Sequence, residues 1–86
     1  MEIKRAVQAG TMQSSDLMVF IEPADELEIE IESTVKKQFE HLIRAQIEAA
    51  LETFAICSGR IRVNDRGALD YAIAARLETG LRRACS

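Results

Sequence analysis

Residues 26–32 alternate strictly between glutamate and aliphatic side chains, and this pattern constrains the fold more than any other part of the sequence. Successive side chains of a strand point to opposite faces of a sheet, so the pattern predicts a strand with one apolar and one acidic face. Just before it, the apolar run Leu17–Ile21 has the length of a strand, and residues 23–25 form a typical turn sequence. We therefore expect these two strands to form an antiparallel hairpin.

A helix is predicted after this hairpin, because apolar residues recur there with a 3.6-residue period. Ser33 or Thr34 can cap its start, and it should end near Ser58 and Gly59. Its apolar stripe consists of Val35, Phe39, Leu42, Ile43, Ile47, Ala50, Leu51 and Phe54.

The last third of the chain predicts one more strand and one more helix. Residues 60–63 alternate as a short strand, residues 64–67 form a turn, and residues 68–84 carry an apolar stripe of helical period. Both helices are buried most simply if they pack on the same side of the sheet. We therefore expect a single domain over residues 1–86 of the α+β class. It should have two layers, an antiparallel sheet of three to four strands with two helices packed on one face.

Composition excludes several classes of function. The 11 Lys and Arg are outnumbered by 14 Asp and Glu, and the resulting net charge of −3 argues against a nucleic-acid binder. No apolar run approaches the ~18 residues of a membrane span, and the first residues lack the apolar core of a secretory signal, so we expect a cytoplasmic protein. Cys57 and Cys85, with a single histidine, are too few for a closed zinc site and should be reduced thiols.

Catalytic groups are scarce in the sequence. A Ser–His–acid arrangement would need Ser14 or Ser15 together with His41, but His41 falls on the polar face of the first predicted helix and should be exposed to solvent. The four glycines match neither a dinucleotide-binding nor a nucleoside-triphosphate-binding pattern. We therefore expect neither a catalytic residue nor a metal site.

Residues 9–16 form a polar segment of mostly small residues immediately before the first predicted strand, which is typical of an exposed loop. An exposed serine beside an acid, as at Ser14–Ser15–Asp16, is accessible to a modifying enzyme. The same serines are also ordinary turn residues. From the local residues alone, the interpretation as turn residues is the better one.

Three stretches in order resemble one family, the acyl carrier protein (gamma chain) of citrate lyase. They are residues 9–23 with Ala-Gly-Thr and Ser-Ser-Asp, residues 35–43 with Val-Lys-Lys-Gln-Phe, and residues 65–78 with Asp-Arg-Gly-Ala-Leu-Asp. The resemblance implies a non-catalytic carrier whose serine is joined by a phosphodiester to phosphoribosyl-dephospho-CoA. Ser14 matches the modified serine, although Gln13 stands where the family commonly has Glu.

The resemblance also implies a reaction cycle and partners. Acetyl and citryl groups would be carried as thioesters on the arm, and citrate would be cleaved to oxaloacetate and acetate. The partners would be the alpha (acyl transferase) and beta (citryl lyase) subunits, in a hetero-oligomer with several copies of each chain, and the prosthetic-group transferase. An arm attached to a loop suits this role, because tethering raises the effective concentration of the thioester at two separate active sites.

Two alternatives remain open. The carrier of malonate decarboxylase uses the same arm but usually lacks the run Gly67–Asp70, and an unmodified α+β adaptor would bind a partner through a strand edge or its acidic face. Phosphopantetheine on Ser15 is a poor alternative, because the order Ser15–Asp16–Leu17 reverses the fatty-acid carrier motif. The acidic face of Glu26, Glu28, Glu30 and Glu32 would either dock a basic surface or be solvated, and solvation is the default.

Overall fold

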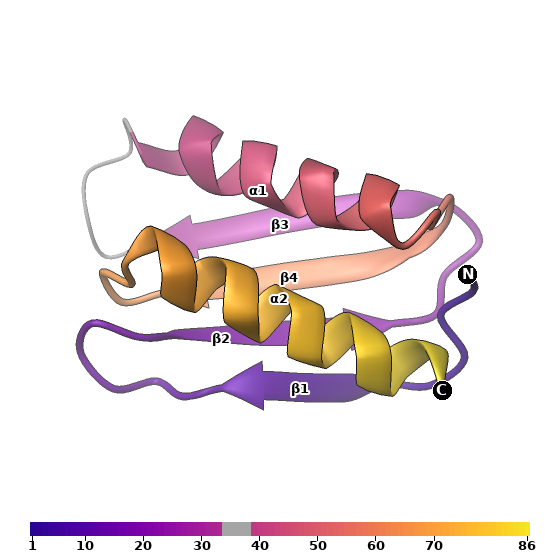
Figure 1. The fold of residues 1–86 in the computed structure, drawn as a ribbon, viewed down its shortest axis with the longest axis horizontal. Helices are drawn as coiled ribbons and strands as arrows, with labels where there is room; N and C mark the ends of the chain where they lie inside the picture. Colours follow the sequence, from indigo (N-terminus) through magenta and orange to yellow (C-terminus); the bar gives the residue numbers. More distant parts are fainter. Residues whose placement is uncertain (34–38) are drawn as a thin grey trace.

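The computed structural model describes residues 1–33 and 39–86 and has four strands and two helices. Figure 1 shows the sheet as one layer and the two helices as the other. In chain order the elements are β1 (Val7–Gly10), β2 (Leu17–Glu22), β3 (Leu27–Ser33), α1 (Glu40–Thr53), β4 (Gly59–Asp65) and α2 (Asp70–Cys85). No helix in the described ranges is long and apolar enough to cross a membrane.

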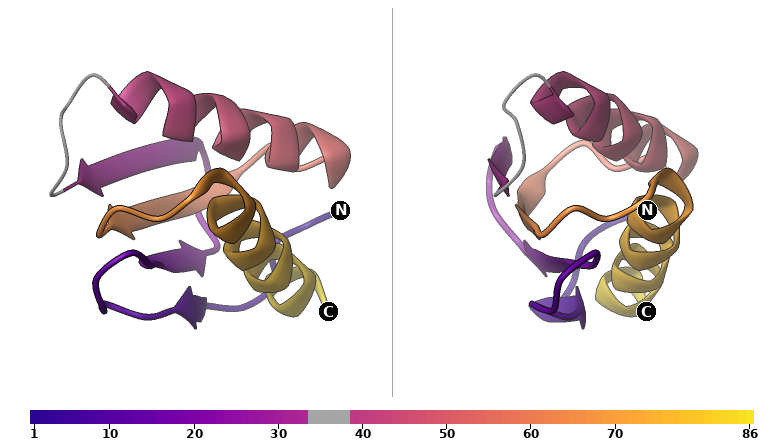
Figure 2. Two further views of the ribbon diagram at one scale, coloured as in Figure 1. Left: turned by 60° about the vertical axis from the view of Figure 1, so that its left-hand side comes forward. Right: turned by 90° about the vertical axis from the view of Figure 1, so that its left-hand side faces the viewer.

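The two helices pack on the same face of the sheet, as the sequence predicts (Figure 2). Their apolar stripes meet the inward side chains of β2 and β4 in one core, in which Ile47, Ile61 and Val19 are completely buried. The other face of the sheet is covered by no helix of the described chain, and there the Arg62 guanidinium lies 5.0 Å from the centre of the Phe20 ring. The predicted α+β class with two layers is therefore confirmed.

The sheet is mixed, and the prediction of a purely antiparallel sheet is wrong. Its strand order is β1-β2-β4-β3, with β4 antiparallel to β2 and parallel to β3. The predicted hairpin between β2 and β3 does not form, because β4 lies between them. The segment from β3 through α1 to β4 is a crossover of the kind that parallel strands require. Alternation in the sequence defines the faces of a strand but not its neighbours.

Helix α1 ends earlier than predicted, and part of its predicted start, including Val35, lies outside the described residues. Ser33 is the last residue of β3 and cannot cap the helix, whereas Thr34 lies outside the described residues. The helix ends at Thr53 because Ala55 adopts a left-handed conformation, with φ of 53°. The amide of Ile56 then donates to the Leu51 carbonyl at 2.9 Å, which is a Schellman ending. Glycine is the usual residue in such an ending, so the alanine gave no sequence signal.

The remaining boundaries differ by a few residues. Strand β4 extends to Asp65, so half of the predicted turn at residues 64–67 is in fact strand. Helix α2 begins at Asp70, two residues later than predicted, with Asp70 in its first turn as the helix dipole favours. Strand β1 was not predicted, and it includes Ala9 and Gly10, which the sequence had assigned to the loop.

Candidate functional site: the serine loop

The loop between β1 and β2, residues 11–16, presents Ser14 to solvent, as the sequence predicts. We call residues 11–16 the serine loop. Ser14 and Ser15 are both exposed. Ser15 has a φ of 65°, which turns the chain back toward β2. Neither serine hydroxyl forms a hydrogen bond with any residue that the structure describes, so both oxygens are accessible from outside.

Gly10 provides the backbone conformation with which the serine loop begins. Gly10 has a φ of 96°, and a side chain there would overlap the carbonyl oxygen of Leu17. That same oxygen accepts a hydrogen bond of 3.1 Å from the amide of Thr11, which closes the base of the loop. The tight approach of the two strands therefore requires a residue without Cβ.

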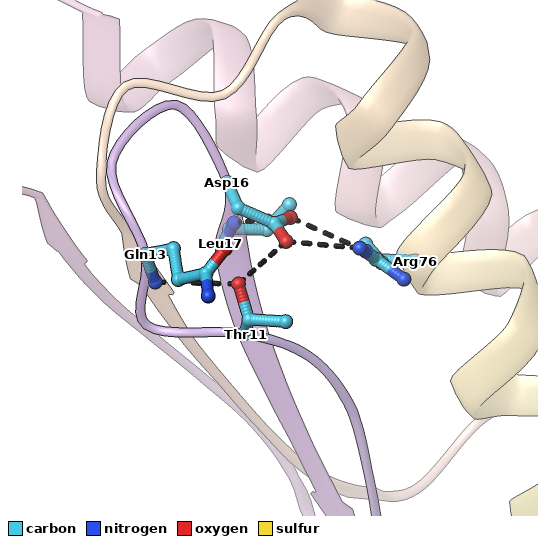
Figure 3. A network of polar contacts seen from close by, with 5 residues as sticks. All are labelled: Thr11, Gln13, Asp16, Leu17 and Arg76. Carbon is cyan, nitrogen blue, oxygen red and sulfur yellow. Dashed lines mark hydrogen bonds and ion pairs between the residues drawn. The ribbon is translucent and has the colours of Figure 1, made fainter.

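Asp16 is the centre of the polar contacts within the loop (Figure 3). Its carboxylate accepts hydrogen bonds from the Thr11 hydroxyl at 2.7 Å and from the Leu17 amide at 2.8 Å. The Thr11 hydroxyl in turn accepts a hydrogen bond of 3.2 Å from the backbone N–H of Gln13. The backbone before and after Ser14 is thus fixed by two side chains, Thr11 and Asp16, which are hydrogen-bonded to each other.

Arg76 of α2 ties this carboxylate to the helix layer. Its Nη2 and Nε donate to the two oxygens of Asp16 at 2.9 and 3.2 Å, a paired geometry seen in Figure 3. The hydrogen bonds from Arg76, and then that from Thr11, lower the pKa of Asp16 from 3.8 to about 2. Asp16 is therefore ionised at neutral pH with its oxygens engaged, and it serves as an anchor rather than as a base. We call this pair the Asp16–Arg76 clamp.

A second contact docks the serine loop on the loop between β4 and α2. The amide of Ser15 donates to the carbonyl of Arg66 at 2.8 Å, and the amide of Arg66 donates to the carbonyl of Asp16 at 2.9 Å. The buried Asp65 accepts hydrogen bonds from the Ala68 amide at 2.9 Å and the Ser33 hydroxyl at 3.1 Å. Asp65 therefore has the structural role of a turn acid.

The other residues considered from the sequence do not join this site. His41 is exposed on α1, as its position on the polar face predicts, and it makes none of the hydrogen bonds of the serine loop. Cys57 is exposed, Cys85 is half-buried, and neither is in a disulfide. The residue that sequence reasoning missed is Arg76, which is 60 positions from Asp16 and lies in an otherwise ordinary helical pattern.

Comparison with known proteins extends the resemblance to whole chains. The family model of the malonate decarboxylase delta subunit (MdcD) matches residues 4–84. A citrate lyase acyl carrier protein of Halothermothrix orenii is 47% identical, over 98% of this chain and 90% of that relative. Another from Enterobacter sp. is 52% identical, over 98% and 88%. The chain belongs to the citrate lyase acyl carrier protein family.

A solved structure supports the fold of this carrier family independently. A chain in the crystal structure of a Pseudomonas malonate decarboxylase hetero-tetramer in complex with malonate superimposes with a TM-score of 0.81. The match covers 95% of this chain and 86% of that chain at 23% identity. At this identity the likeness establishes the shared fold.

Proposed function

We propose that the chain is the non-catalytic acyl carrier subunit of citrate lyase, with Ser14 as its attachment residue. In this proposal the Ser14 Oγ is joined by a phosphodiester to phosphoribosyl-dephospho-CoA. The observation that carries the proposal is the exposed Ser14 hydroxyl in a loop that the Asp16–Arg76 clamp holds in place. Membership of the family of citrate lyase acyl carrier proteins supports the choice of complex.

The loop suits attachment by an external enzyme. Attachment requires the Ser14 Oγ to lose its proton and to attack the phosphorus of an activated form of the group, so that the new O–P bond forms as the bond from phosphorus to the donor's leaving group breaks. The neighbouring Asp16 cannot accept that proton at neutral pH, because Arg76 lowers its pKa to about 2 and its oxygens already accept hydrogen bonds. Asp16 therefore does not serve as the base, and in this proposal the prosthetic-group transferase supplies it, while this chain contributes an accessible oxygen on a loop held by hydrogen bonds.

The fixed loop also suits the carrier role after attachment. When bound, the group supplies a terminal thiol that carries acetyl and citryl as thioesters between the alpha (acyl transferase) and beta (citryl lyase) subunits. The protein's own part is to keep the attachment point in a defined place while the arm moves. Tethering of this kind replaces diffusion between two active sites with a local search, which raises the effective concentration of the thioester.

Intact mass measurement with fragmentation tests the proposal on protein co-produced with the modifying enzymes. We expect an increment of one phosphoribosyl-dephospho-CoA located on Ser14. The matched variants are Ser14→Ala, which should abolish the increment while the fold is retained, and Ser15→Ala, which should keep it. An increment that survives in Ser14→Ala would contradict the site. No increment in the presence of active modifying enzymes would favour the unmodified adaptor.

The carrier subunit of malonate decarboxylase is the second candidate. It is favoured by the family model over residues 4–84 and by the superposition on the Pseudomonas chain. The identities of 40–52% to citrate lyase carriers and the run Gly67–Asp70 favour citrate lyase. Reconstitution of the modified chain with the large subunits of each enzyme decides between them. We expect turnover of citrate and none of malonate.

A further inference from the structure

A hollow opens beside the serine loop, between the start of α1 and the loop from β4 to α2. It encloses about 570 Å³, a volume within the range typical of small-molecule sites. Four large apolar side chains line it and remain strongly exposed, namely Phe39, Leu42, Leu69 and Tyr71. We call it the aromatic hollow. Clustered exposed apolar side chains of this kind mark binding sites in soluble proteins.

The aromatic hollow lies close to the serine loop. Ser15 is hydrogen-bonded to Arg66 at 2.8 Å, and Gly67 and Ala68, the next two residues, already line the hollow. Leu69 is three residues beyond Arg66, so its Cα lies at most about 11 Å from that of Arg66. Both helices begin at this end of the sheet, beside the two loops (Figure 1). A group attached to Ser14 is therefore tethered next to the hollow.

The lining favours a neutral aromatic ring over an anion. Phe39 and Tyr71 offer ring faces on which a nucleobase can stack. Asp65 and Asp70 are also among the residues that line the hollow, and their negative charges would repel a phosphate. Gln46 adds an amide that can both donate to and accept from the edge of a base.

We propose that the aromatic hollow binds the adenine ring of the arm attached to Ser14, with Tyr71 stacked on the base. This inference rests on the proposed function, because it takes the arm to be a nucleotide on that serine. The phosphoribosyl unit links the serine to the adenosine, so the adenine is closer to the attachment point than the thiol is. A docked adenine holds the first part of the arm against the carrier and leaves the pantetheine part and its thiol free to move.

Nuclear magnetic resonance of the modified carrier tests this proposal. The carbon-bound protons of the adenine should be shifted upfield relative to free dephospho-CoA, because they lie over the Tyr71 ring. Tyr71 is 75% exposed, so its replacement should leave the fold intact. Tyr71→Ala should lower the ratio of docked to undocked arm about tenfold, as expected for the loss of one base–aromatic stack. Tyr71→Phe, which keeps the ring, should retain the upfield shift.

Leu27→Ala is the control for a general loss of exposed apolar surface. Leu27 is exposed to 43% and pairs with Gly59 at the opposite end of the sheet, so its replacement should leave the adenine shifts unchanged. The mass increment on Ser14 is measured first on the same sample. If it is absent, the proposed function fails and this inference fails with it.

If the increment is present, any one of four results would overturn the inference alone. The adenine protons could resonate as in free dephospho-CoA, or their shifts could persist in Tyr71→Ala. The signals of Tyr71 could change only when the alpha or beta subunit is added, which would assign the aromatic hollow to a partner. The Tyr71 signals could instead change with the concentration of the carrier, which would assign the aromatic hollow to a second copy of this chain.

Discussion

The two ends of the sheet use the same residue types for different purposes. Each end has a glycine with positive φ, Gly10 or Gly59, and an arginine in contact with carboxylates. At the serine end, Arg76 donates two hydrogen bonds of 2.9 and 3.2 Å to Asp16, whose side chain is only 16% exposed. At the opposite end, Arg60 lies 3.5, 3.9 and 3.3 Å from three glutamates that are about half exposed.

Geometry decides what each charged cluster does. The Asp16–Arg76 clamp has paired hydrogen bonds, and its carboxylate also binds the backbone of the serine loop. The Arg60 cluster has longer contacts, and its Nε is buried without a hydrogen-bond partner among the described residues. Exposed ion pairs with loose geometry contribute little to stability and are screened by salt. The clamp therefore fixes a loop, whereas the Arg60 cluster balances the charge of an acidic sheet face.

The largest effect should come from the glycine of the serine end. Gly10→Ala places a residue with Cβ at a φ of 96° and against the Leu17 carbonyl oxygen. The left-handed conformation alone costs about 1–3 kcal/mol for a residue other than glycine, and the overlap with backbone adds to this. We expect a lower free energy of unfolding in urea and slower modification of Ser14.

Gly59→Ala is the matched variant at the opposite end. The φ of 137° at Gly59 is also unfavourable for alanine, but the new Cβ would meet the end of the Ile3 side chain, which can move, and would not overlap with backbone. The loss of stability should therefore be smaller than in Gly10→Ala. Modification of Ser14 should proceed at the normal rate. Equal slowing of modification in both variants would mean that global stability, and not the local geometry of the serine loop, controls attachment.

The sequence predicted the faces of the elements better than their neighbours. Much of the apolar stripe of each helix is buried as expected, for example at Ile47 and Leu77, and the alternating residues of β4 have their aliphatic side chains inside. The stripe residues Phe39 and Leu42 are exceptions, because they are exposed near the start of α1. The pairing of β3 with β4 was not predictable from alternation, because either strand order buries the same faces. Strand β1 was missed because it is only four residues long and ends in glycine.

The candidate site was only partly predictable for a related reason. The loop character of residues 11–16 follows from local composition, and Ser14 as the modified residue is a prediction from the family resemblance. The Asp16–Arg76 clamp depends on a contact between residues 60 positions apart. A helical arginine on a partly exposed face has no sequence signal that separates it from a solvated one, so only the packing of α2 on the sheet reveals it.

The next effect in size should follow from breaking the clamp. Asp16→Asn removes the charge that Arg76 pairs with and weakens the hydrogen bonds to the loop. The amide of Ser15 should then exchange with solvent faster by roughly tenfold, as expected for the loss of a charged hydrogen bond. In Arg76→Gln the exchange of the same amide should become faster by a similar factor. The double variant Asp16→Asn and Arg76→Gln should exchange little faster than either single variant, because both changes break the same contact. Additive effects would argue against a single clamp.

The pH dependence of stability should report the same contact. The Arg76 hydrogen bonds lower the pKa of Asp16 in the folded protein to about 2, below its ordinary value of 3.8. The contribution of Asp16 to stability is therefore present above about pH 4 and is lost as the pH falls to about 2. The melting temperatures of the wild type and Asp16→Asn should differ at neutral pH and converge in this range. A difference that stays constant down to pH 2 would contradict the assignment.

The smallest effect should be at the opposite end, in the double variant Glu28→Gln and Glu30→Gln. Arg60 already balances part of the charge of these glutamates within the chain, and both are exposed, so we expect the urea midpoint to stay the same within error. For the same reason we expect assembly with the large subunits to be unchanged, as measured by co-purification at low and high salt. Weaker assembly that depends on salt would instead identify the acidic face as a docking surface for a basic partner, because long-range attraction between charged surfaces is screened by ions. The two ends of the sheet would then both be functional, one for attachment of the arm and the other for placing the carrier in its complex.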